Sequence, residues 1–184
     1  MRNMTVLLDM DSVIVNTPKG FIEKWKEIFP EIPYVPYEKM SSLCLEELYP
    51  PEHKDKVLQI WTTPGLFYGL KPLDRALESI EEIRKIAKDV VICTSSPGKS
   101  RYAIQEKYEW VRNNLDEDWL KRLVITRDKT RINGDILIDD KPKISGVQNP
   151  SWEHVIYTQP WNVNVKGLRR LTWDNWKDVL VELN

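Results

Sequence analysis

TVLLDMDSVIVNT, the stretch from Thr5 to Thr17, places two acids, Asp9 and Asp11, inside an apolar run. Valine, leucine and isoleucine residues precede and follow the two acids, as in a strand that is covered on both faces. Burying an unpaired carboxylate costs several kcal/mol, so such a strand needs something that compensates its two charges. What compensates them decides whether this chain carries out chemistry.

The composition is that of one globular domain without a strong charge. The chain has 184 residues, which fits one domain with a small insertion, and its formal net charge is −1. This balance gives no basic field that would favour nucleic acid polymers or a membrane surface. No apolar run approaches the ~20 residues of a membrane-spanning helix. Cys44 and Cys93 are interpreted as reduced thiols of a cytoplasmic protein, with a disulfide between them as the alternative.

Five short apolar runs predict the strands of a parallel sheet, because they are nearly continuous in Val, Ile and Leu rather than alternating. They are Thr5–Leu8, Val90–Thr94, Leu123–Thr126, Ile136–Ile138 and Val155–Thr158. Helical patterns cover Leu73–Ala87, Tyr102–Leu115 and Asn175–Leu183. The second of these helices is expected to bury Ile104, Tyr108, Val111 and Leu115. Strand and helix alternate, so the predicted class is α/β with a doubly wound parallel sheet.

The segment from residue 16 to residue 72 breaks this alternation, because it shows helical patterns but no strand-like run. We expect a first helix capped by Thr17, a second over Tyr37–Tyr49, and a third from Pro51 to Trp61. We interpret 16–72 as a small helical cap inserted after the first strand, and 1–15 with 73–184 as the catalytic core. The alternative is that these helices cover one face of the sheet.

Acids, bases and hydroxyls follow four of the predicted strands. The carboxyl ends of parallel strands meet at one edge of the sheet, where open α/β sheets bind ligands. Acids at that edge require a cation, bases require an anion, and hydroxyls can donate hydrogen bonds to it. A magnesium ion with a phosphate satisfies all three groups. In strand order the residues are Asp9 and Asp11, Thr94 to Ser96, Arg127 and Lys129, and Asp139 and Asp140.

Each of these motifs alone also has a purely structural interpretation. An acid pair after a strand is often a turn or a helix cap, and TSSPGKS also suits a loop that caps the next helix. TRDKT alone is typical of a solvated charge cluster. The functional interpretation rests on all four motifs following strands in this order.

DMDSV, ICTSSP, TRDKT and LIDDKP, in this order, resemble the four motifs of the haloacid dehalogenase superfamily of phosphotransferases. EKYEWV (Glu106–Val111), ITRDKT, LIDDKP and SWEHVIYT further resemble the 5′(3′)-deoxyribonucleotidases, which dephosphorylate deoxynucleoside monophosphates. The resemblance is strongest from Val91 to Thr158 and weak in the cap. It implies a Rossmann-like core with a small helical cap, and a small nucleoside monophosphate as the partner, with a homodimer left open.

The resemblance also implies a role for each matched residue. Asp9 is the nucleophile that becomes a phosphoaspartate, and Asp11 is the general acid and base. The phosphate is bound by Thr94, Ser95 and Lys129. Magnesium is held by Asp9, the main-chain carbonyl of Asp11 and Asp140, although the sequence alone does not separate Asp140 from Asp139. The remaining predicted substrate contacts are Trp61, Thr17, Leu43 and Arg127.

The sequence departs from the family pattern at three places. Ser12 replaces the glycine of D-M-D-G-V, Thr17 stands where the family has an aromatic, and Leu43 or Cys44 replaces a cap aromatic. Trp61 is kept, and with Phe67 and Tyr68 it favours a flat base over a sugar. Two alternatives stay open: a phosphatase of the same mechanism for another small phosphomonoester, and a non-catalytic binding protein on this fold.

Overall fold

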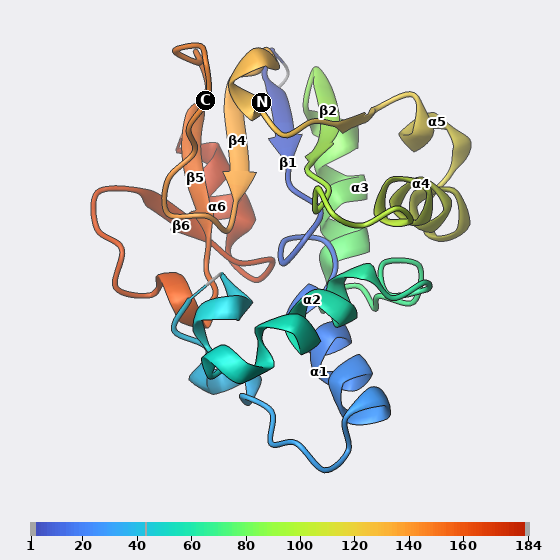
Figure 1. Cartoon of the computed structure of the whole chain (residues 1–184). Helices are drawn as coiled ribbons and strands as arrows, with labels where there is room; N and C mark the ends of the chain where they lie inside the picture. The colour runs from blue at the N-terminus through green and yellow to red at the C-terminus, as the bar shows by residue number, and fades with distance from the viewer. Residues whose placement is uncertain (1–2, 43, 183–184) are drawn as a thin grey trace.

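A computed structural model describes residues 3–42 and 44–182. Within them, six strands form one sheet in the order β3-β2-β1-β4-β5-β6, and every neighbouring pair is parallel (Figure 1). The strands are β1 (Thr5–Leu8), β2 (Asp89–Thr94), β3 (Leu123–Ile125), β4 (Ile136–Asp139), β5 (Glu153–Tyr157) and β6 (Arg169–Leu171). The strand order reverses next to β1, which confirms the predicted doubly wound sheet.

The strand β6 was not predicted from the sequence. It has only three residues and lies at the edge of the sheet, where it pairs with β5 alone. Two of those residues, Arg169 and Arg170, are charged, and only Leu171 is buried. An edge strand with a polar composition carries no apolar run that periodicity could detect.

The helices of the described residues are α1 (Thr17–Ile28), α2 (Lys54–Thr62), α3 (Ala76–Ile86), α4 (Ala103–Asn114), α5 (Glu117–Leu120) and α6 (Trp176–Val181). Asn16, not Thr17, caps α1, because its side chain accepts a hydrogen bond from the Lys19 amide at 3.2 Å. The four-residue α5 was not predicted. The predicted Cys44–Cys93 alternative is excluded, since both thiols are free.

The predicted buried face of α4 is wrong for two of its four residues. Ile104 is 58% exposed and Tyr108 is 43% exposed. The buried residues of this helix are Ala103, Lys107, Trp110 and Val111. The indole of Trp110 donates to the Leu70 carbonyl at 2.7 Å, so specific polar contacts fix the rotation of α4.

The predicted helix over Tyr37–Tyr49 is also wrong. This stretch contains two short 3-10 turns, η1 (Tyr37–Lys39) and η2 (Leu45–Glu47). Between them the Ser42 hydroxyl accepts a hydrogen bond from the Cys44 amide at 3.0 Å. Serine side chains compete in this way with the helical hydrogen-bond ladder, so the backbone leaves the helix. The predicted third helix is present as a 3-10 turn, η3 (Pro51–His53), followed by α2.

The segment from residue 16 to residue 72 starts and ends at neighbouring points of the backbone. Val15 and Pro72 form an antiparallel bridge, and the Leu73 amide donates to the Ile14 carbonyl at 2.8 Å. In Figure 1, α1 and α2 lie beyond the carboxyl ends of the strands rather than across a face of the sheet. This arrangement supports the proposal that 16–72 is a cap over a core of 1–15 and 73–184.

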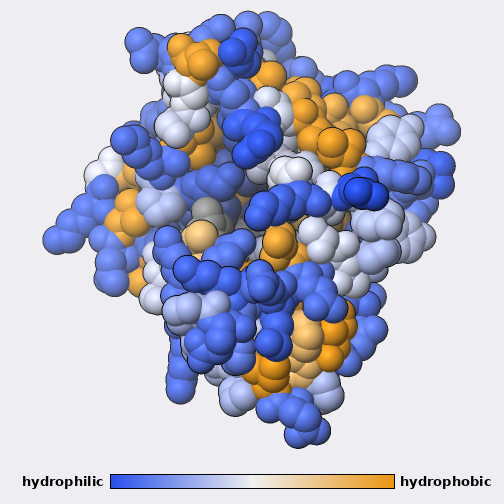
Figure 2. All heavy atoms as spheres, viewed as in Figure 1, coloured by the Kyte–Doolittle hydropathy of each residue, from blue (hydrophilic) through white to orange (hydrophobic). Residues whose placement is uncertain are grey.

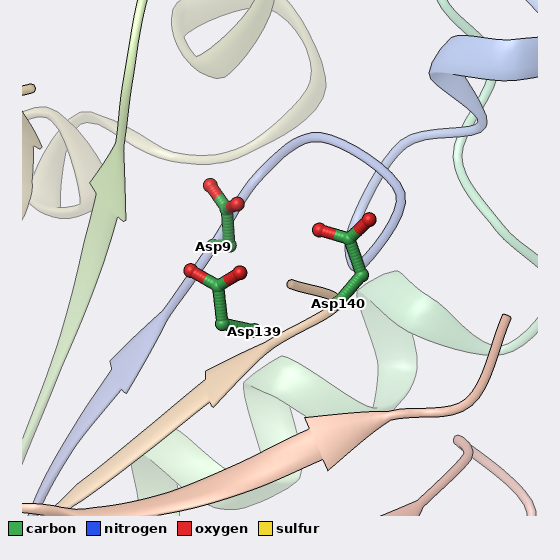
Figure 3. Close-up of side chains that lie close together, drawn as sticks. All are labelled: Asp9, Asp139 and Asp140. Atoms are coloured by element: carbon green, nitrogen blue, oxygen red, sulfur yellow. The ribbon is translucent and has the colours of Figure 1, made fainter. Parts of the chain in front are cut away.

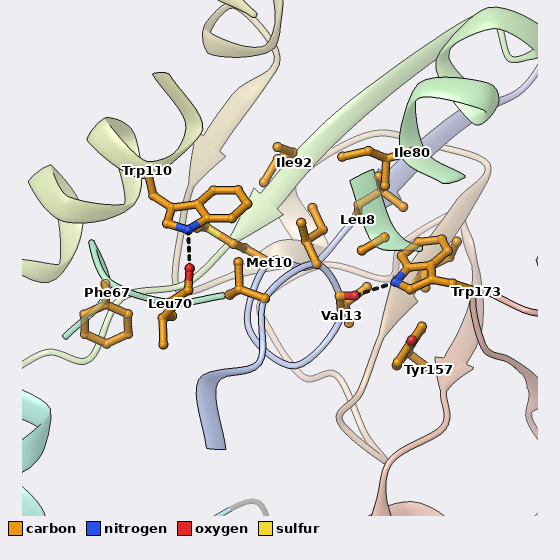
Figure 4. Packing of buried hydrophobic residues seen from close by; sticks show 14 of the residues in the cluster. Leu8, Met10, Val13, Phe67, Leu70, Ile80, Ile92, Trp110, Tyr157 and Trp173 are labelled. Carbon is orange, nitrogen blue, oxygen red and sulfur yellow. Dashed lines mark hydrogen bonds between the residues drawn. The ribbon is translucent and has the colours of Figure 1, made fainter. Parts of the chain in front are cut away.

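Two tryptophans connect the two ends of the segment 16–72 to the hydrophobic core (Figure 4). Trp110 bonds Leu70 at the end of the segment, and Trp173 donates to the Val13 carbonyl at 2.7 Å before its start. The buried core runs without a break from the sheet into α1 and α2. On the face shown in Figure 2, hydrophilic side chains dominate and hydrophobic ones gather in separate groups. Among the described residues, no helix has the length and apolar character needed to cross a membrane.

Candidate active site

Three carboxylates converge at the carboxyl ends of β1 and β4 (Figure 3). Asp9, Asp139 and Asp140 are buried, and one carboxylate oxygen of each lies within 4.8 Å of the others. The two strands are neighbours at the point where the strand order reverses, which is the usual ligand site of an open α/β sheet. The buried ammonium of Lys129 lies 2.9 Å from Asp9 Oδ1 and 2.5 Å from Asp139 Oδ2.

The hydrogen bonds distinguish the two neighbouring acids Asp139 and Asp140. Both oxygens of Asp139 are used, one by Lys129 Nζ and the other by the Lys141 amide at 2.9 Å. By contrast, Asp140 Oδ2 is buried and has no hydrogen-bond partner among the described residues. Asp140 is therefore the acid with a free acceptor, while Asp139 holds Lys129 in place.

The electrostatics leave this cluster short of positive charge. Burial raises the pKa of Asp140 well above its usual range, and the charges of Asp139 and Asp9 raise it further. Burial also raises the pKa of Asp9, but Lys129, Lys141 and Lys107 together outweigh burial and lower that pKa overall. Three buried carboxylates against one buried ammonium, with a free oxygen on Asp140, fit a divalent cation that prefers oxygen ligands.

The carboxylate of Asp11 lies outside this cluster and has its own partners. Its Oδ2 is paired with the fully buried ammonium of Lys107, and its Oδ1 accepts from the Thr17 hydroxyl at 2.9 Å. Lys107 also donates to Thr94 Oγ1 at 2.8 Å and to the Ser95 carbonyl at 2.6 Å. Thus α4 holds one acid from the β1 loop and the hydroxyl loop after β2.

Sequence reasoning missed Lys107, although a signal was present. Ala103, Lys107, Trp110 and Val111 recur at helical spacing and form one face of α4. A lysine on such a face is either paired or extended to solvent, and here it is paired. The neighbouring Glu106 also has a function, because its carboxylate accepts the backbone amides of Gly65 at 2.6 Å and Phe67 at 2.9 Å.

Some of the hydroxyl and basic residues predicted at the strand ends, Ser95, Ser96 and Arg127, line one cavity of about 360 Å³. Thr94 is fully buried and is used by Lys107, and Lys129 is buried against Asp9 and Asp139, so neither belongs to the lining residues. Gly98 lies against Arg127, and a Cβ there would come within 3.1 Å of the guanidinium. Asp9, Asp11, Asp140 and Lys141 complete the polar end of the cavity, and Lys141 was not predicted.

The cavity also has apolar and aromatic lining residues. Trp61, predicted from the sequence, lines it together with Leu45 and Phe67. Thr17, also predicted, lines it beside Asp11, to which its hydroxyl donates. Trp161, which was not predicted, lines it from the turn after β5. Tyr68 is 54% exposed and does not belong to the lining residues. Leu43 lies outside the described residues.

Ser12 has the backbone conformation that favours glycine. Its φ is +59°, which is the left-handed region. The Ser12 amide donates to the Val15 carbonyl at 2.8 Å, and the Gln159 side chain donates to the Ser12 carbonyl at 2.5 Å. These two hydrogen bonds hold the loop after Asp11 in the left-handed conformation, although Ser12 has a side chain.

Comparisons with known proteins identify a family and relatives that the chain resembles. Residues 3–183 match the family model described as 5′ nucleotidase, deoxy (Pyrimidine), cytosolic type C protein. The chain is 38% identical to the mitochondrial 5′(3′)-deoxyribonucleotidase of Mus musculus over 97% of this chain and 86% of that protein. It is 36% identical to the cytosolic type 5′(3′)-deoxyribonucleotidase of Homo sapiens over 97% and 94% of the two chains.

Among solved structures, the fold resembles a haloacid dehalogenase family hydrolase from Deinococcus radiodurans with bound phosphate and sodium. The TM-score is 0.60 at 14% identity, with 97% of this chain and 95% of that chain covered. At this identity the likeness concerns the fold alone.

Proposed function

The chain belongs to the 5′(3′)-deoxyribonucleotidase family, and from this premise we propose that it hydrolyses deoxyribonucleoside monophosphates to the deoxynucleoside and inorganic phosphate. The observation that carries the proposal is the buried Asp9–Asp139–Asp140 cluster beside Asp11, at the polar end of a cavity with an aromatic wall. This arrangement offers a nucleophile, a proton donor and a cation site within one cavity.

In the first step a carboxylate oxygen of Asp9 attacks the phosphorus. A new O–P bond forms, the ester bond from phosphorus to the sugar oxygen breaks, and that oxygen takes a proton from Asp11. Lys129 keeps Asp9 ionised for this attack, in keeping with the lowered pKa of Asp9. Thr17 and Lys107 fix the Asp11 carboxyl so that its proton is delivered to one side of the phosphoryl group.

In the second step water hydrolyses the phosphoaspartate. Asp11, now ionised, removes a proton from the water, whose oxygen attacks phosphorus while the bond to Asp9 breaks. Lys107 contacts the Asp11 carboxylate directly and holds it in place. Ser95 and Arg127 line the cavity near these acids, where they can hold the phosphoryl oxygens during both steps.

Magnesium is the cation that we propose for this site. Asp9, Asp140 and the main-chain carbonyl of Asp11 would hold it, because Asp140 has a free buried oxygen and Asp139 does not. When bound, it supplies charge that neutralises the phosphoryl oxygens and the surplus carboxylates. The two free thiols and the cytosolic type relative support a cytoplasmic location.

A panel assay of the purified protein tests the proposal. Phosphate release is measured for the four common deoxynucleoside 5′-monophosphates, their 3′ isomers and several sugar phosphates, with magnesium and with a strong chelator. We expect deoxynucleotides to be the best substrates, activity to disappear with chelator, and magnesium to restore it. A preference for a sugar phosphate would favour the alternative phosphatase, and full activity in verified metal-free protein would remove magnesium from the mechanism.

Metal binding is also measurable without turnover. Because Asp140 offers a free buried oxygen, magnesium should raise the melting temperature of the protein, and this rise should be lost in Asp140→Asn. An Asp135→Asn variant is the matched control, since Asp135 lies at the other end of β4 and bonds the Thr5 amide. Equal stabilisation of Asp140→Asn and the control by magnesium would contradict this site.

A further inference from the structure

Trp161 lines the same cavity as Trp61 but comes from a different part of the chain. Trp61 belongs to α2, whereas Trp161 belongs to the short 3-10 turn η5 (Pro160–Asn162), which follows β5 in the core. A second hollow of about 580 Å³ shares Ser42, Trp61 and Trp161 with the cavity. The two indoles therefore lie between the cavity and the second hollow, and Asp9 lines only the first.

The turn that carries Trp161 is held by buried side chains. Gln159 and Asn162, on either side of it, are 3% and 0% exposed. Gln159 donates to the Ser12 carbonyl at 2.5 Å, and Asn162 donates to the Asp140 carbonyl at 2.8 Å. The turn is thus fastened to both loops that carry the acids of the site, so Trp161 has a fixed position relative to them.

The two indoles also have separate supports. Trp61 packs on Phe21 at a ring-centroid distance of 5.2 Å and on Phe67 at 6.1 Å. Trp161 packs edge to face with Tyr37 at 6.4 Å and 89°. The two indoles thus pack on different rings, and Tyr37, which supports Trp161, comes from the segment 16–72 while Trp161 itself comes from the core.

We infer that Trp161 determines specificity by forming, together with Trp61, a stacking site for the nucleobase of the substrate. This inference rests on the proposed function, because the phosphate must lie at Asp9 and Arg127 for the base to reach the two indoles. Aromatic side chains bind bases through stacking that is largely independent of base identity. A base bound there contacts Trp61 from the segment 16–72 and Trp161 from the core together.

The test is a ratio of specificity constants on one protein preparation. The numerator is the kcat/KM for the best deoxynucleoside 5′-monophosphate, and the denominator is that for 2-deoxyribose 5-phosphate, which lacks only the base. Trp161→Ala should lower this ratio by roughly 5- to 150-fold. Trp161→Phe, which keeps a flat face, should restore most of it, whereas Trp161→Leu, which keeps only apolar bulk, should not.

The outcomes separate this inference from the function on which it rests. If the wild-type protein hydrolyses no deoxynucleotide, the proposed function fails. If it does, and the ratio is unchanged in Trp161→Ala, Trp161 is only a packing residue for Tyr37 and the inference is overturned. Equal ratios in Trp161→Phe and Trp161→Leu would likewise overturn stacking, and this pair decides the question if the alanine variant does not fold.

Discussion

The edge of the sheet that carries the acids and the segment over residues 37–62 that faces it enclose one cavity, yet they are built differently. At the edge, buried charged side chains are held by specific polar contacts, as Lys129 is by Asp9 and Asp139, while Asp140 keeps one buried oxygen without a partner among the described residues. In the facing segment, short 3-10 turns and α2 present Leu45 and Trp61, which are held by apolar and aromatic packing.

This difference predicts different consequences of substitution. Isosteric changes at the edge should remove chemistry and leave the fold, because they alter a charge without creating a cavity. Changes in the facing segment should alter substrate choice and stability together, because the same rings line the cavity and fill the core. The following variants test that distinction, from the largest expected effect to the smallest.

Asp9→Asn should abolish turnover, with a loss of at least about 10³-fold, because the amide has the shape of the carboxylate but is no nucleophile. Its thermal melting in chelator should stay close to wild type or improve, since one of three clustered carboxylates is removed. Steady-state kinetics and a melting curve measure the two effects. Activity near wild type would contradict covalent catalysis through Asp9, and Asp135→Asn at the far end of β4 is the control.

Lys107→Met should lower kcat/KM by about 10²- to 10³-fold, because Asp11 loses its ammonium partner and Thr94 loses its donor. The melting temperature should fall as well, because the buried Thr94 hydroxyl and the Ser95 carbonyl are left without their donor. Arg112→Met on the exposed side of α4 is the matched control. Unchanged kinetics would limit Lys107 to a packing role.

Lys107 is also an example of a site residue that the sequence did not predict. The first five strands and the acids after β1 and β4 were predicted because apolar runs and strand-end motifs are local signals, and the structure has β1 to β5 there. The rotation of α4 depends on contacts with Asp11 and the Leu70 carbonyl, which are distant in sequence. Trp161 is a similar case, because the turn that carries it is held by side-chain bonds of Gln159 and Asn162 to residues distant in sequence. Periodicity carries no information about such contacts.

The predicted helix over Tyr37 to Tyr49 was wrong for a different reason. Its helical pattern was real, but the Ser42 side chain captures a backbone amide and the chain forms separate turns. Buried parallel strands can be predicted from a local run of apolar residues. Irregular backbone depends on individual side-chain hydrogen bonds, which the hydrophobic pattern does not show.

Trp61→Ala tests the facing segment. If the indole stacks on the base, the nucleotide should lose an amount corresponding to roughly 1–3 kcal/mol in kcat/KM, while a base-free ester should change little. Trp61 also packs on Phe21 and Phe67, so the melting temperature should fall in either case. The ratio of the two specificity constants is therefore the measurement. An unchanged ratio in the folded variant would show that Trp61 is a packing residue and does not stack on the base.

Ser12→Gly should have the smallest effect, and it concerns the loop that joins the two regions. Ser12 has a φ of +59°, a conformation that costs a side-chain-bearing residue roughly 1–2 kcal/mol. Glycine removes this strain but gains about 0.4–1 kcal/mol of freedom in the unfolded chain. We therefore expect a net stabilisation of roughly 0–1.5 kcal/mol in denaturant unfolding.

The comparison that isolates the strain is Ser12→Ala, which removes the hydroxyl but keeps a Cβ in the same conformation. It should not stabilise the protein, whereas glycine should. Catalysis should stay within a few-fold of wild type in both variants, because Ser12 bonds Val15 and Gln159 through its backbone. A glycine variant less stable than the alanine variant would show that the loop is relaxed. In that case Ser12 carries no backbone strain, and the loop between the edge of the sheet and the cap is not a strained connection.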